Sequence, residues 1–212
     1  EKKLNRKFNE NQVIAHGIES RFRYQPKKQK PIDSYSFDNP FRMIYVSSID
    51  YYKHQWNVVE AVSLLRNKGY PVELRLYGIA NSGPKKFLDK SIKKFDPEGN
   101  FILFEDEVDF NSIDKIYKSS DLSIFASSCE TFGQIVLESM ASGLPIACSS
   151  KSSMKEIVKD GCIYFNPLEV NQILTALETL LDSTDLRSSI AKKAYTQASN
   201  FSWEKTSILS WL

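Results

Sequence analysis

The chain has 212 residues, 42% hydrophobic and 25% charged, which is typical of one large globular domain or of one domain with a small appendage. The formal charge of +2 excludes a global field that would favour nucleic acid, so any anion site must be local. Cys129, Cys148 and Cys162 are widely spaced and accompanied by only two histidines. This pattern predicts small buried thiols rather than disulfides or a zinc site. No apolar run has the length of a membrane span, and the chain opens on a charged segment. We therefore expect a cytoplasmic protein that at most lies against the inner face of a membrane.

The first 30 residues combine a charged stretch with some helical character, a short apolar segment and a basic run. The segment NQVIAHG, which ends at Gly17, predicts a short strand. The basic run RFRYQPKKQK covers residues 21–30 and is followed by Pro31. Most short charge runs are solvated, and no nucleic-acid-binding fold surrounds this one, so we interpret it as a solvated linker. Contact with a membrane surface remains a lesser hypothesis.

From residue 41 onward, apolar runs of strand length alternate with segments of helical period. The expected strands are 41–48, 71–78, 100–104, 121–127, 145–149 and 162–165. The expected helices are 54–69, 87–95, 111–120, a helix before Gly143, 151–161, 170–181, 185–200 and 202–212. A polar loop is expected at 81–86. Asn111 or Ser112 is the expected cap of the third helix, and Ser152 or Ser153 that of the helix at 151–161. Strands that alternate with helices through short loops predict an α/β fold with a parallel sheet covered on both faces.

Polar residues follow the expected strands where ligands of an open parallel sheet bind, outside the carboxyl ends. These residues are Ser47, Ser48 and Lys53 after the first strand, Gly78 after the second, Glu105 to Glu107 after the third, and Ser127 to Gly133 after the fourth.

The stretch 127–150 contains two carboxylates, Glu130 just before a helix and Glu138 about two turns into it. A helix continuous over this interval would separate the two backbones by ~12 Å. Paired carboxyl groups of glycosidases lie only roughly 5–9.5 Å apart. We therefore interpret Glu130 and Glu138 as two contacts at opposite ends of one elongated ligand, with the helix N-terminus between them.

The helix N-terminus itself is suited to a phosphate. Gly133 lets a ligand approach the backbone, and amides near Thr131, Phe132 and Gly133 add to the helix dipole. Lys53 supplies a full positive charge, so the pattern describes a diphosphate site that requires no metal. The alternatives are that Glu130 only complements the helix dipole, that Glu138 makes a buried structural hydrogen bond, and that Lys53 is a plain surface lysine. The defining residues of Rossmann NAD sites, P-loops and nucleophile elbows are absent.

The segment ETFGQIVLESMASGLPIACS, with Glu130 and Glu138 separated by seven residues, resembles the signature of retaining glycosyltransferases of the GT-B fold, family 4. VIAHGIESRF, FRMIYVSSIDYYKHQ, SSMKEIVKDGCIYFNP and FSWEKTSILSWL resemble further segments of that family, so the match covers nearly the whole chain. The resemblance implies a Rossmann-like, doubly wound sheet in a single GT-B C-terminal domain. Residues 1–30 would be a linker or N-terminal segment, residues 31–200 the donor-binding domain, and residues 201–212 a closing helix.

The resemblance also implies roles for individual residues. Glu130 would bind hydroxyls of the donor sugar, Lys53 would neutralise the diphosphate leaving group, and both are expected to be catalytic. Glu138 would bind the ribose hydroxyls of the nucleotide. The remaining expected donor contacts are Ser47, Ser48, Gly78, Asp106, Glu107, Val108, Thr131, Phe132, Gly133 and Gln134. The resemblance implies neither a metal nor a cofactor.

Two features qualify this expectation. The family usually has Gly-Arg where this chain has Ser47-Ser48, so one positive charge near the diphosphate is missing. Ser152-Ser153 likewise replaces a common Gly-Gly.

In GT-B enzymes the acceptor-binding half precedes the donor half, so we expect a longer bacterial enzyme of polysaccharide biosynthesis whose missing N-terminal domain binds a glycan or lipid-linked acceptor. The chain alone would bind nucleotide sugar weakly and transfer little. The alternatives are a degenerate donor domain kept for binding or assembly, and a related sugar-nucleotide epimerase.

Overall fold

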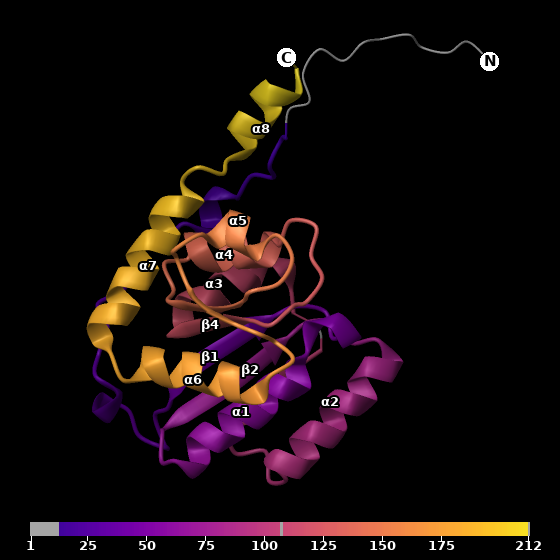
Figure 1. Ribbon diagram of the computed structural model, residues 1–212, viewed down its shortest axis with the longest axis vertical. Helices are drawn as coiled ribbons and strands as arrows, with labels where there is room; N and C mark the ends of the chain where they lie inside the picture. The colour runs from indigo at the N-terminus through magenta and orange to yellow at the C-terminus, as the bar shows by residue number, and fades with distance from the viewer. Residues whose placement is uncertain (1–12, 107, 212) are drawn as a thin grey trace, which may run out of the picture.

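The computed structural model describes residues 13–106 and 108–211, and its centre is one six-stranded sheet (Figure 1). The strand order is β3-β2-β1-β4-β5-β6, and every neighbouring pair is parallel. The order reverses between β1 and β4, which makes the gap between them the topological switch point. The strands are β1 Phe41–Val46, β2 Val72–Tyr77, β3 Ile102–Glu105, β4 Leu122–Phe125, β5 Ile146–Ser149 and β6 Ile163–Phe165. The predicted charged stretch before residue 13 lies outside the described residues.

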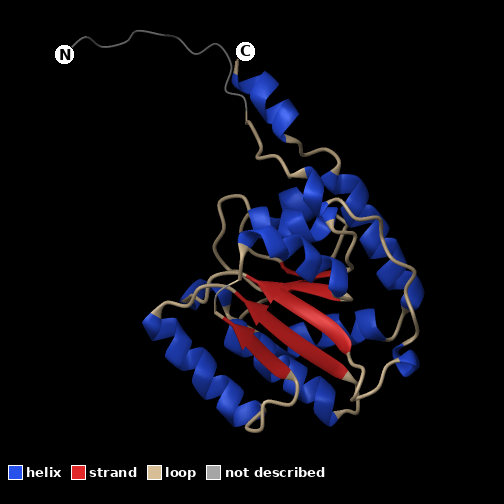
Figure 2. Ribbon diagram, turned by 180° about the vertical axis from the view of Figure 1, so that it is seen from behind, coloured by secondary structure: helices blue, strands red, loops and turns tan. Residues whose placement is uncertain are grey.

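Helices cover both faces of the sheet, as Figure 2 shows from behind. On one face, α1 packs against α2 and α6, and these three helices lie low in Figure 1. On the other face, α4 packs against α5 and α7, and α3 lies beside them. The helices are α1 Gln55–Asn67, α2 Ser82–Phe95, α3 Ile113–Ser119, α4 Gln134–Ala141, α5 Met154–Val158, α6 Val170–Leu181, α7 Thr184–Ala198 and α8 Trp203–Ser210. The predicted Rossmann-like, doubly wound architecture is therefore confirmed.

One predicted helix start is wrong, whereas Ser112 stands at the predicted N-cap position of α3 without making a side-chain cap bond. α2 begins at Ser82, inside the predicted polar loop. Pro84 is compatible with this start because it lies in the first turn, where backbone N–H groups make no intrahelical hydrogen bond and a proline loses none. The turn before α3 is capped by Asp109, whose side chain accepts from the Asn111 amide at 3.0 Å, and the Ser112 side chain makes no capping bond.

The segment before β1 differs from both of its predictions. Residues 13–19 form neither helix nor strand and pair with no strand of the described sheet. The basic run is not a solvated linker, because Phe22 is 1% exposed and belongs to the core. Tyr24 also donates its amide proton to the Ala141 carbonyl at 3.1 Å. Aromatic side chains of this segment contact α3, where the Phe22 ring meets Tyr117 and the Tyr24 hydroxyl donates to Asp114, and the Tyr24 amide ties the segment to α4.

Arg187 of α7 is completely buried and joins the basic run to the end of α6. It donates to the carbonyls of Leu180 at 2.5 Å, Leu181 at 2.6 Å and Lys30 at 2.5 Å. The first two acceptors lie at the negative end of the α6 dipole, which compensates the buried charge. Burial nonetheless lowers the pKa of the guanidinium.

Replacing Arg187 with lysine is expected to lower the free energy of unfolding by about 3 kcal/mol, because one ammonium cannot reproduce the fork that reaches both segments. Urea unfolding measures the change. Lys192→Arg on the exposed face of the same helix is the control, with an expected change below about 0.5 kcal/mol. Equal effects of the two substitutions would show that the buried fork contributes nothing specific.

Candidate functional site

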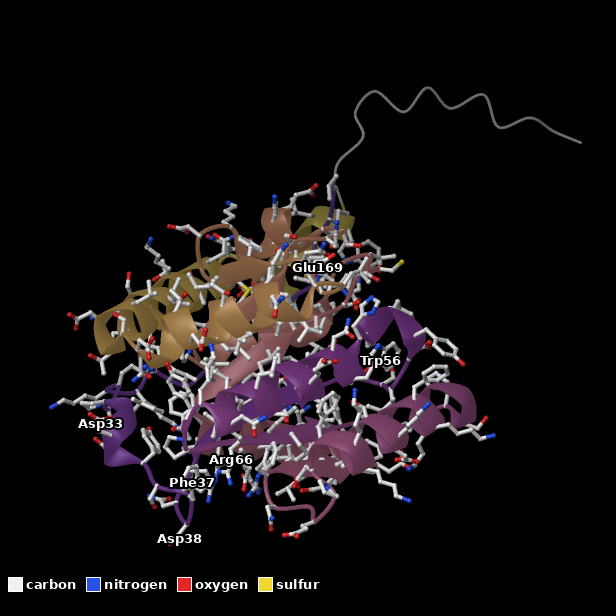
Figure 3. The ribbon with its side chains drawn as sticks, turned by 60° about the horizontal axis from the view of Figure 1, so that its bottom comes forward. Asp33, Phe37, Asp38, Trp56, Arg66 and Glu169 are labelled. Carbon is white, nitrogen blue, oxygen red and sulfur yellow. The ribbon has the colours of Figure 1, made fainter. Side chains whose placement is uncertain are left out.

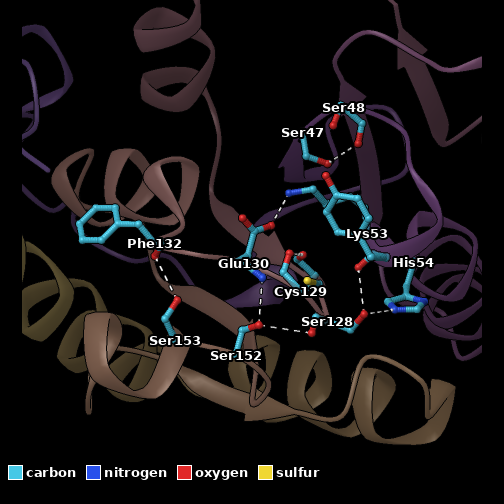
Figure 4. Close-up of polar contacts among 12 residues, drawn as sticks. Ser47, Ser48, Lys53, His54, Ser128, Cys129, Glu130, Phe132, Ser152 and Ser153 are labelled. Atoms are coloured by element: carbon cyan, nitrogen blue, oxygen red, sulfur yellow. Dashed lines mark hydrogen bonds and ion pairs between the residues drawn. The ribbon is translucent and has the colours of Figure 1, made fainter. Parts of the chain in front are cut away.

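Lys53 and Glu130 meet at the switch point of the sheet. Lys53 ends the short 3-10 turn Tyr51–Lys53 after β1, and Glu130 lies in the loop after β4, the neighbouring strand. The Lys53 ammonium donates to Oε1 of Glu130 (Figure 4). The two side chains are only 6% and 15% exposed. The alternative of a plain surface lysine is therefore wrong.

The backbone around Lys53 is fixed by neighbouring side chains. The Tyr45 hydroxyl donates to the Lys53 carbonyl at 2.8 Å. His54 has a left-handed backbone, with φ of 52°, and its Nε2 lies 2.8 Å from Oγ of Ser128. The Ser128 amide in turn donates to the Tyr52 carbonyl at 2.8 Å. The loops after β1 and β4 are thus tied together before any ligand is considered.

Ser152 and Ser153 support the Glu130 loop instead of capping α5. Oγ of Ser152 accepts from the Glu130 amide at 2.9 Å and donates to the Ser128 carbonyl at 3.3 Å. The Ser153 hydroxyl donates to the Phe132 carbonyl at 3.4 Å, and neither serine makes a side-chain cap bond to α5 (Figure 4). Ser153 occupies the predicted N-cap position of α5, but its hydroxyl, like that of Ser152, is used across the loop and makes no cap bond.

α4 begins after Glu130, so the two carboxylates are not joined by one continuous helix. Gly133 precedes the first residue of α4 with φ of 89°, and a Cβ there would lie 2.6 Å from Cε of Met154. The ~12 Å separation estimated for a continuous helix therefore does not apply. Glu138 is the fifth residue of α4 and lies little more than one turn, not two, from its start. The amides of Thr131, Phe132 and Gly133 donate to no acceptor within 13–106 and 108–211.

A pocket of about 220 Å³ opens beside this helix start. His16, which sequence reasoning left without a role, lines it, and its ring centroid lies 4.9 Å from that of Phe132. Gln134 donates through Nε2 to the Gly17 carbonyl at 3.1 Å, whereas its Oε1 is buried and accepts from no described residue. The other lining residues are Phe125, Glu130, Thr131, Phe132, Gly133 and Ile135. A larger hollow, about 510 Å³, lies between α2 and β3 and contains no predicted site residue.

Glu138 is 8% exposed, and its nearest recorded partner is weak: the Tyr117 hydroxyl lies 3.4 Å from Oε2. Burial raises the pKa of Glu138 to about 7, against the opposing effects of the Tyr117 hydrogen bond and the Arg21 charge. A carboxylate that served only as a structural acceptor would be expected to have shorter hydrogen bonds.

Arg21, predicted to lie in a solvated linker, instead donates to the Phe110 carbonyl at 2.8 Å and lies 4.1 Å from the Phe110 ring centroid.

The remaining predicted residues lie on neighbouring loops outside the pocket lining. Gln55 holds the turn after β1 by donating to Oγ of Ser47 and to the Ser48 carbonyl, both at 2.9 Å. Gly78 approaches this turn so closely that a Cβ would lie 2.2 Å from the Ser47 carbonyl oxygen. Val108 packs partly buried against the core. Glu107 lies outside the described residues.

The arrangement combines one ammonium, three amides without a described acceptor, the start of a helix and two carboxylates, one of which is paired with the ammonium. Amides and an ammonium attract a phosphate group, and carboxylates accept from hydroxyl groups. Within 13–106 and 108–211 no group of three or more His, Cys, Asp or Glu side chains is placed to hold a metal ion.

Cys129 is exposed in the Glu130 loop, contrary to the expectation that all three thiols are buried, whereas Cys148 and Cys162 are buried.

Comparisons with known proteins agree with this fold. The O-antigen chain mannosyltransferase B of Escherichia coli is 26% identical over 165 residues, which are 76% of this chain and 42% of that protein. The crystal structure of the C-terminal domain of a glycosyl transferase group 1 family protein (LpcC) from Francisella tularensis is similar with a TM-score of 0.72 and 23% identity, over 87% of this chain and 97% of that one. Anabaena HepE in complex with UDP-glucose has a TM-score of 0.71 and 23% identity, over 83% of this chain and 50% of HepE.

The chain spans less than half the length of the curated relatives that it matches, such as 21% of the sulfoquinovosyl transferase SQD2 of Arabidopsis thaliana and 42% of the E. coli protein. No helix among the described residues is both long and apolar enough to cross a membrane.

The domain family named glycosyl transferases group 1 matches residues 26–197, which include β1 to β6 and the switch-point loops. The chain therefore belongs to the glycosyl transferases group 1 and has the GT-B C-terminal fold.

Proposed function

We propose that this chain is the donor-binding half of a retaining, family 4 glycosyltransferase that moves a sugar from a nucleotide-diphosphate sugar to a glycan or lipid-linked acceptor. The observation that carries the proposal is the buried Lys53–Glu130 pair at the switch point, beside a helix start whose amides have no described acceptor. The similarity to HepE, which was crystallised with UDP-glucose, supports a nucleotide-sugar donor. The acceptor would bind through a preceding domain.

In this proposal the Lys53–Glu130 ion pair opens when the donor binds, and each partner then contacts a different part of the donor. A diphosphate at the start of α4 attracts the Lys53 ammonium, which then leaves the Glu130 carboxylate. The released carboxylate can accept hydrogen bonds from the donor sugar in the adjoining pocket. Lys53 and the amides of Phe132 and Gly133 then stabilise the negative charge that develops on the leaving diphosphate. His16 and Gln134 line the same pocket and are additional candidates for contacts with the sugar.

Glu138 is assigned to the ribose hydroxyls. Its pKa of about 7 means that the ligand-free chain holds it partly protonated near neutral pH. Two hydroxyl donors favour the ionised form, so nucleotide binding lowers this pKa and releases a proton below pH 7. Binding is therefore expected to tighten as the pH rises toward 7 and to level off above it, which nucleotide titration at several pH values measures.

A second candidate function follows from Ser48. The exposed Ser48 stands where relatives of the proposed family usually have arginine, and Lys53 is the cation that the described loops bring to the Glu130 loop. A single cation favours binding of a nucleotide diphosphate with weak or no transfer, as in a donor domain kept for binding or assembly. Assays of the full-length protein distinguish the two functions, since transfer or donor hydrolysis excludes the binding-only alternative.

A thermal-shift screen of nucleoside diphosphates and their sugars tests the proposed binding. A ligand that binds only the folded chain stabilises it by about 2.7 kcal/mol at one hundred times its Kd, so at least one diphosphate should raise the Tm clearly. Glu138→Ala should abolish that shift, and the exposed Lys90→Ala on α2 should leave it unchanged. No shift with any nucleotide, or equal shifts in the wild-type chain and Glu138→Ala, would contradict the proposal.

A further inference from the structure

A second charged pocket lies at the opposite end of the sheet. Lys27, Lys28 and Lys30 of the segment before β1 surround it together with Arg42, the second residue of β1, and Asp121, which precedes β4. We call this hollow of about 300 Å³ the basic pocket. Arg42 and Asp121 lie at the amino ends of the central strands, whereas the Lys53 loop lies at the carboxyl ends. Figure 3 shows the same separation, with Phe37 and Asp38 of the loop before β1 at one end of the molecule and Trp56 of α1 at the other.

The positive charge of the basic pocket is only partly balanced. It has four cationic side chains and one carboxylate, in a chain whose total formal charge is +2. Both oxygens of Asp121 are already engaged: Oδ2 accepts from the Arg42 amide at 2.9 Å, and the Tyr35 hydroxyl lies 3.4 Å from Oδ1. The carboxylate therefore holds the backbone and Tyr35, and Glu73 at 3.8 Å from Nε of Arg42 is the one further carboxylate recorded beside these cations in the described chain.

The cationic groups have few partners among the described residues. The Arg42 guanidinium makes no recorded hydrogen bond among the described residues. Oε1 of Glu73 lies 3.8 Å from Nε of Arg42, but this oxygen accepts a hydrogen bond from Nε of Arg75 at 2.6 Å. The ammonium groups of Lys28 and Lys30 form no recorded hydrogen bond or ion pair within 13–106 and 108–211.

Lys27 is the one lysine of the basic pocket with a recorded acceptor in the described chain. Its ammonium donates to the Ser120 carbonyl at 2.9 Å. Burial lowers the pKa of this ammonium; Asp121 opposes that effect, and the nearby charges of Lys118 and Arg42 add to it. Cations held this close repel one another, and a bound anion would relieve that repulsion.

We propose that the basic pocket binds a phosphate-bearing anion, independently of the donor site. A planar guanidinium flanked by ammonium groups is the donor set that proteins use for phosphate, and the surplus of cations favours a multivalent anion over a single carboxylate. The hollow is larger than inorganic phosphate alone requires, so the phosphate can be carried by a small soluble molecule or by a lipid headgroup.

Two parallel experiments on the whole 212-residue chain test the proposal and distinguish the two sources. In the first, inorganic phosphate and pyrophosphate are titrated against amide NMR spectra. Shifts at residues 27–30 and 119–121 report the basic pocket, and shifts at 130–135 report the donor site. In the second, the chain is sedimented with vesicles of phosphatidylcholine alone or mixed with phosphatidylglycerol. Binding to the soluble anions alone identifies a soluble ligand, and binding to the anionic vesicles identifies a lipid headgroup.

The matched variants are Lys28→Glu/Lys30→Glu in the basic pocket and Lys86→Glu/Lys90→Glu on exposed positions of α2, which change the net charge equally. The pocket variant is expected to weaken binding at least about tenfold, since each cation contributes strongly near an anionic group. The α2 variant should leave binding unchanged, and Lys28→Arg/Lys30→Arg should retain it. The substituted pocket lysines are exposed, so unfolding curves should match the wild type. The proposal would be overturned by equal weakening in the two charge-reversal variants, or by the absence of shifts at residues 27–30 and 119–121 together with no binding to anionic vesicles.

Discussion

Replacing Glu138 with glutamine is expected to stabilise the ligand-free chain at pH 8 while removing its affinity for nucleotide. The folded pKa of about 7 lies above the ordinary value of 4.5, so the folded state binds more protons than the unfolded state between these values. The free energy of unfolding therefore falls as the pH rises from about 4.5 through 7. At one pKa unit per 1.36 kcal/mol, the ionised carboxylate costs the folded state up to about 3 kcal/mol at pH 8. Glutamine has no such cost.

Urea unfolding at pH 5 and pH 8, with nucleotide titration of the same samples, measures both effects. The stabilisation should be present at pH 8 and nearly absent at pH 5. Glu156→Gln, on an exposed carboxylate of α5, should change stability by less than about 0.5 kcal/mol at either pH. A destabilised Glu138→Gln that still binds nucleotide would instead identify Glu138 as the structural acceptor that the sequence left open.

Removing only the cation of the switch-point pair is expected to destabilise the fold. Lys53→Met leaves the largely buried Glu130 carboxylate without its partner and should cost about 3 kcal/mol, the size typical of breaking a buried pair. Lys53→Met combined with Glu130→Gln removes both charges and should recover at least about 1 kcal/mol of that loss. All of these variants should lose donor binding, because each lacks a group that the donor contacts.

The exposed pair of Lys68 and Glu178 provides the comparison. Lys68 is half exposed, with 2.5 Å between its ammonium and Oε1 of Glu178. Lys68→Met should therefore change stability by less than about 1 kcal/mol and leave nucleotide binding intact. If Lys53→Met were no more destabilising than Lys68→Met, the switch-point pair would not be the preorganised element proposed here.

Periodic apolar patterns predicted most of the fold. The helical period from Val170 to Leu181 predicted α6 with its observed ends, because its apolar face packs on α1 and β6. The strand predicted before Gly17 fails for a physical reason: Val13 is 92% exposed, and no described strand lies beside it to accept its ladder bonds. A short apolar run cannot reveal whether a partner strand exists.

For the candidate site, the sequence predicted where Lys53 and Glu130 lie in the sheet but not the contact between them. The expected position of Lys53 after the first strand and Glu130 after the fourth placed both at one edge of the sheet. Their ion pair depends on two loops that lie 77 residues apart in sequence, and it is buried by the aromatic residues around it. His16 and Arg21 were missed because the sequence assigns their segment to a strand and a linker. Arg21 lies beside the buried Phe22, and the His16 ring lies near those of Phe132 and Trp203; no local pattern shows these long-range contacts.

Amide NMR mapping of the best nucleotide from the thermal-shift screen tests the central claim most directly, because it locates the ligand on the chain. The account predicts perturbations at Lys53, at Thr131 to Gln134 and at Glu138, and it predicts that Lys53→Met loses all of them because it loses donor binding. The loops between β1 and α1 and between β4 and α4 should respond together, since they form one site. Perturbations confined to other elements, such as the hollow between α2 and β3, would contradict it.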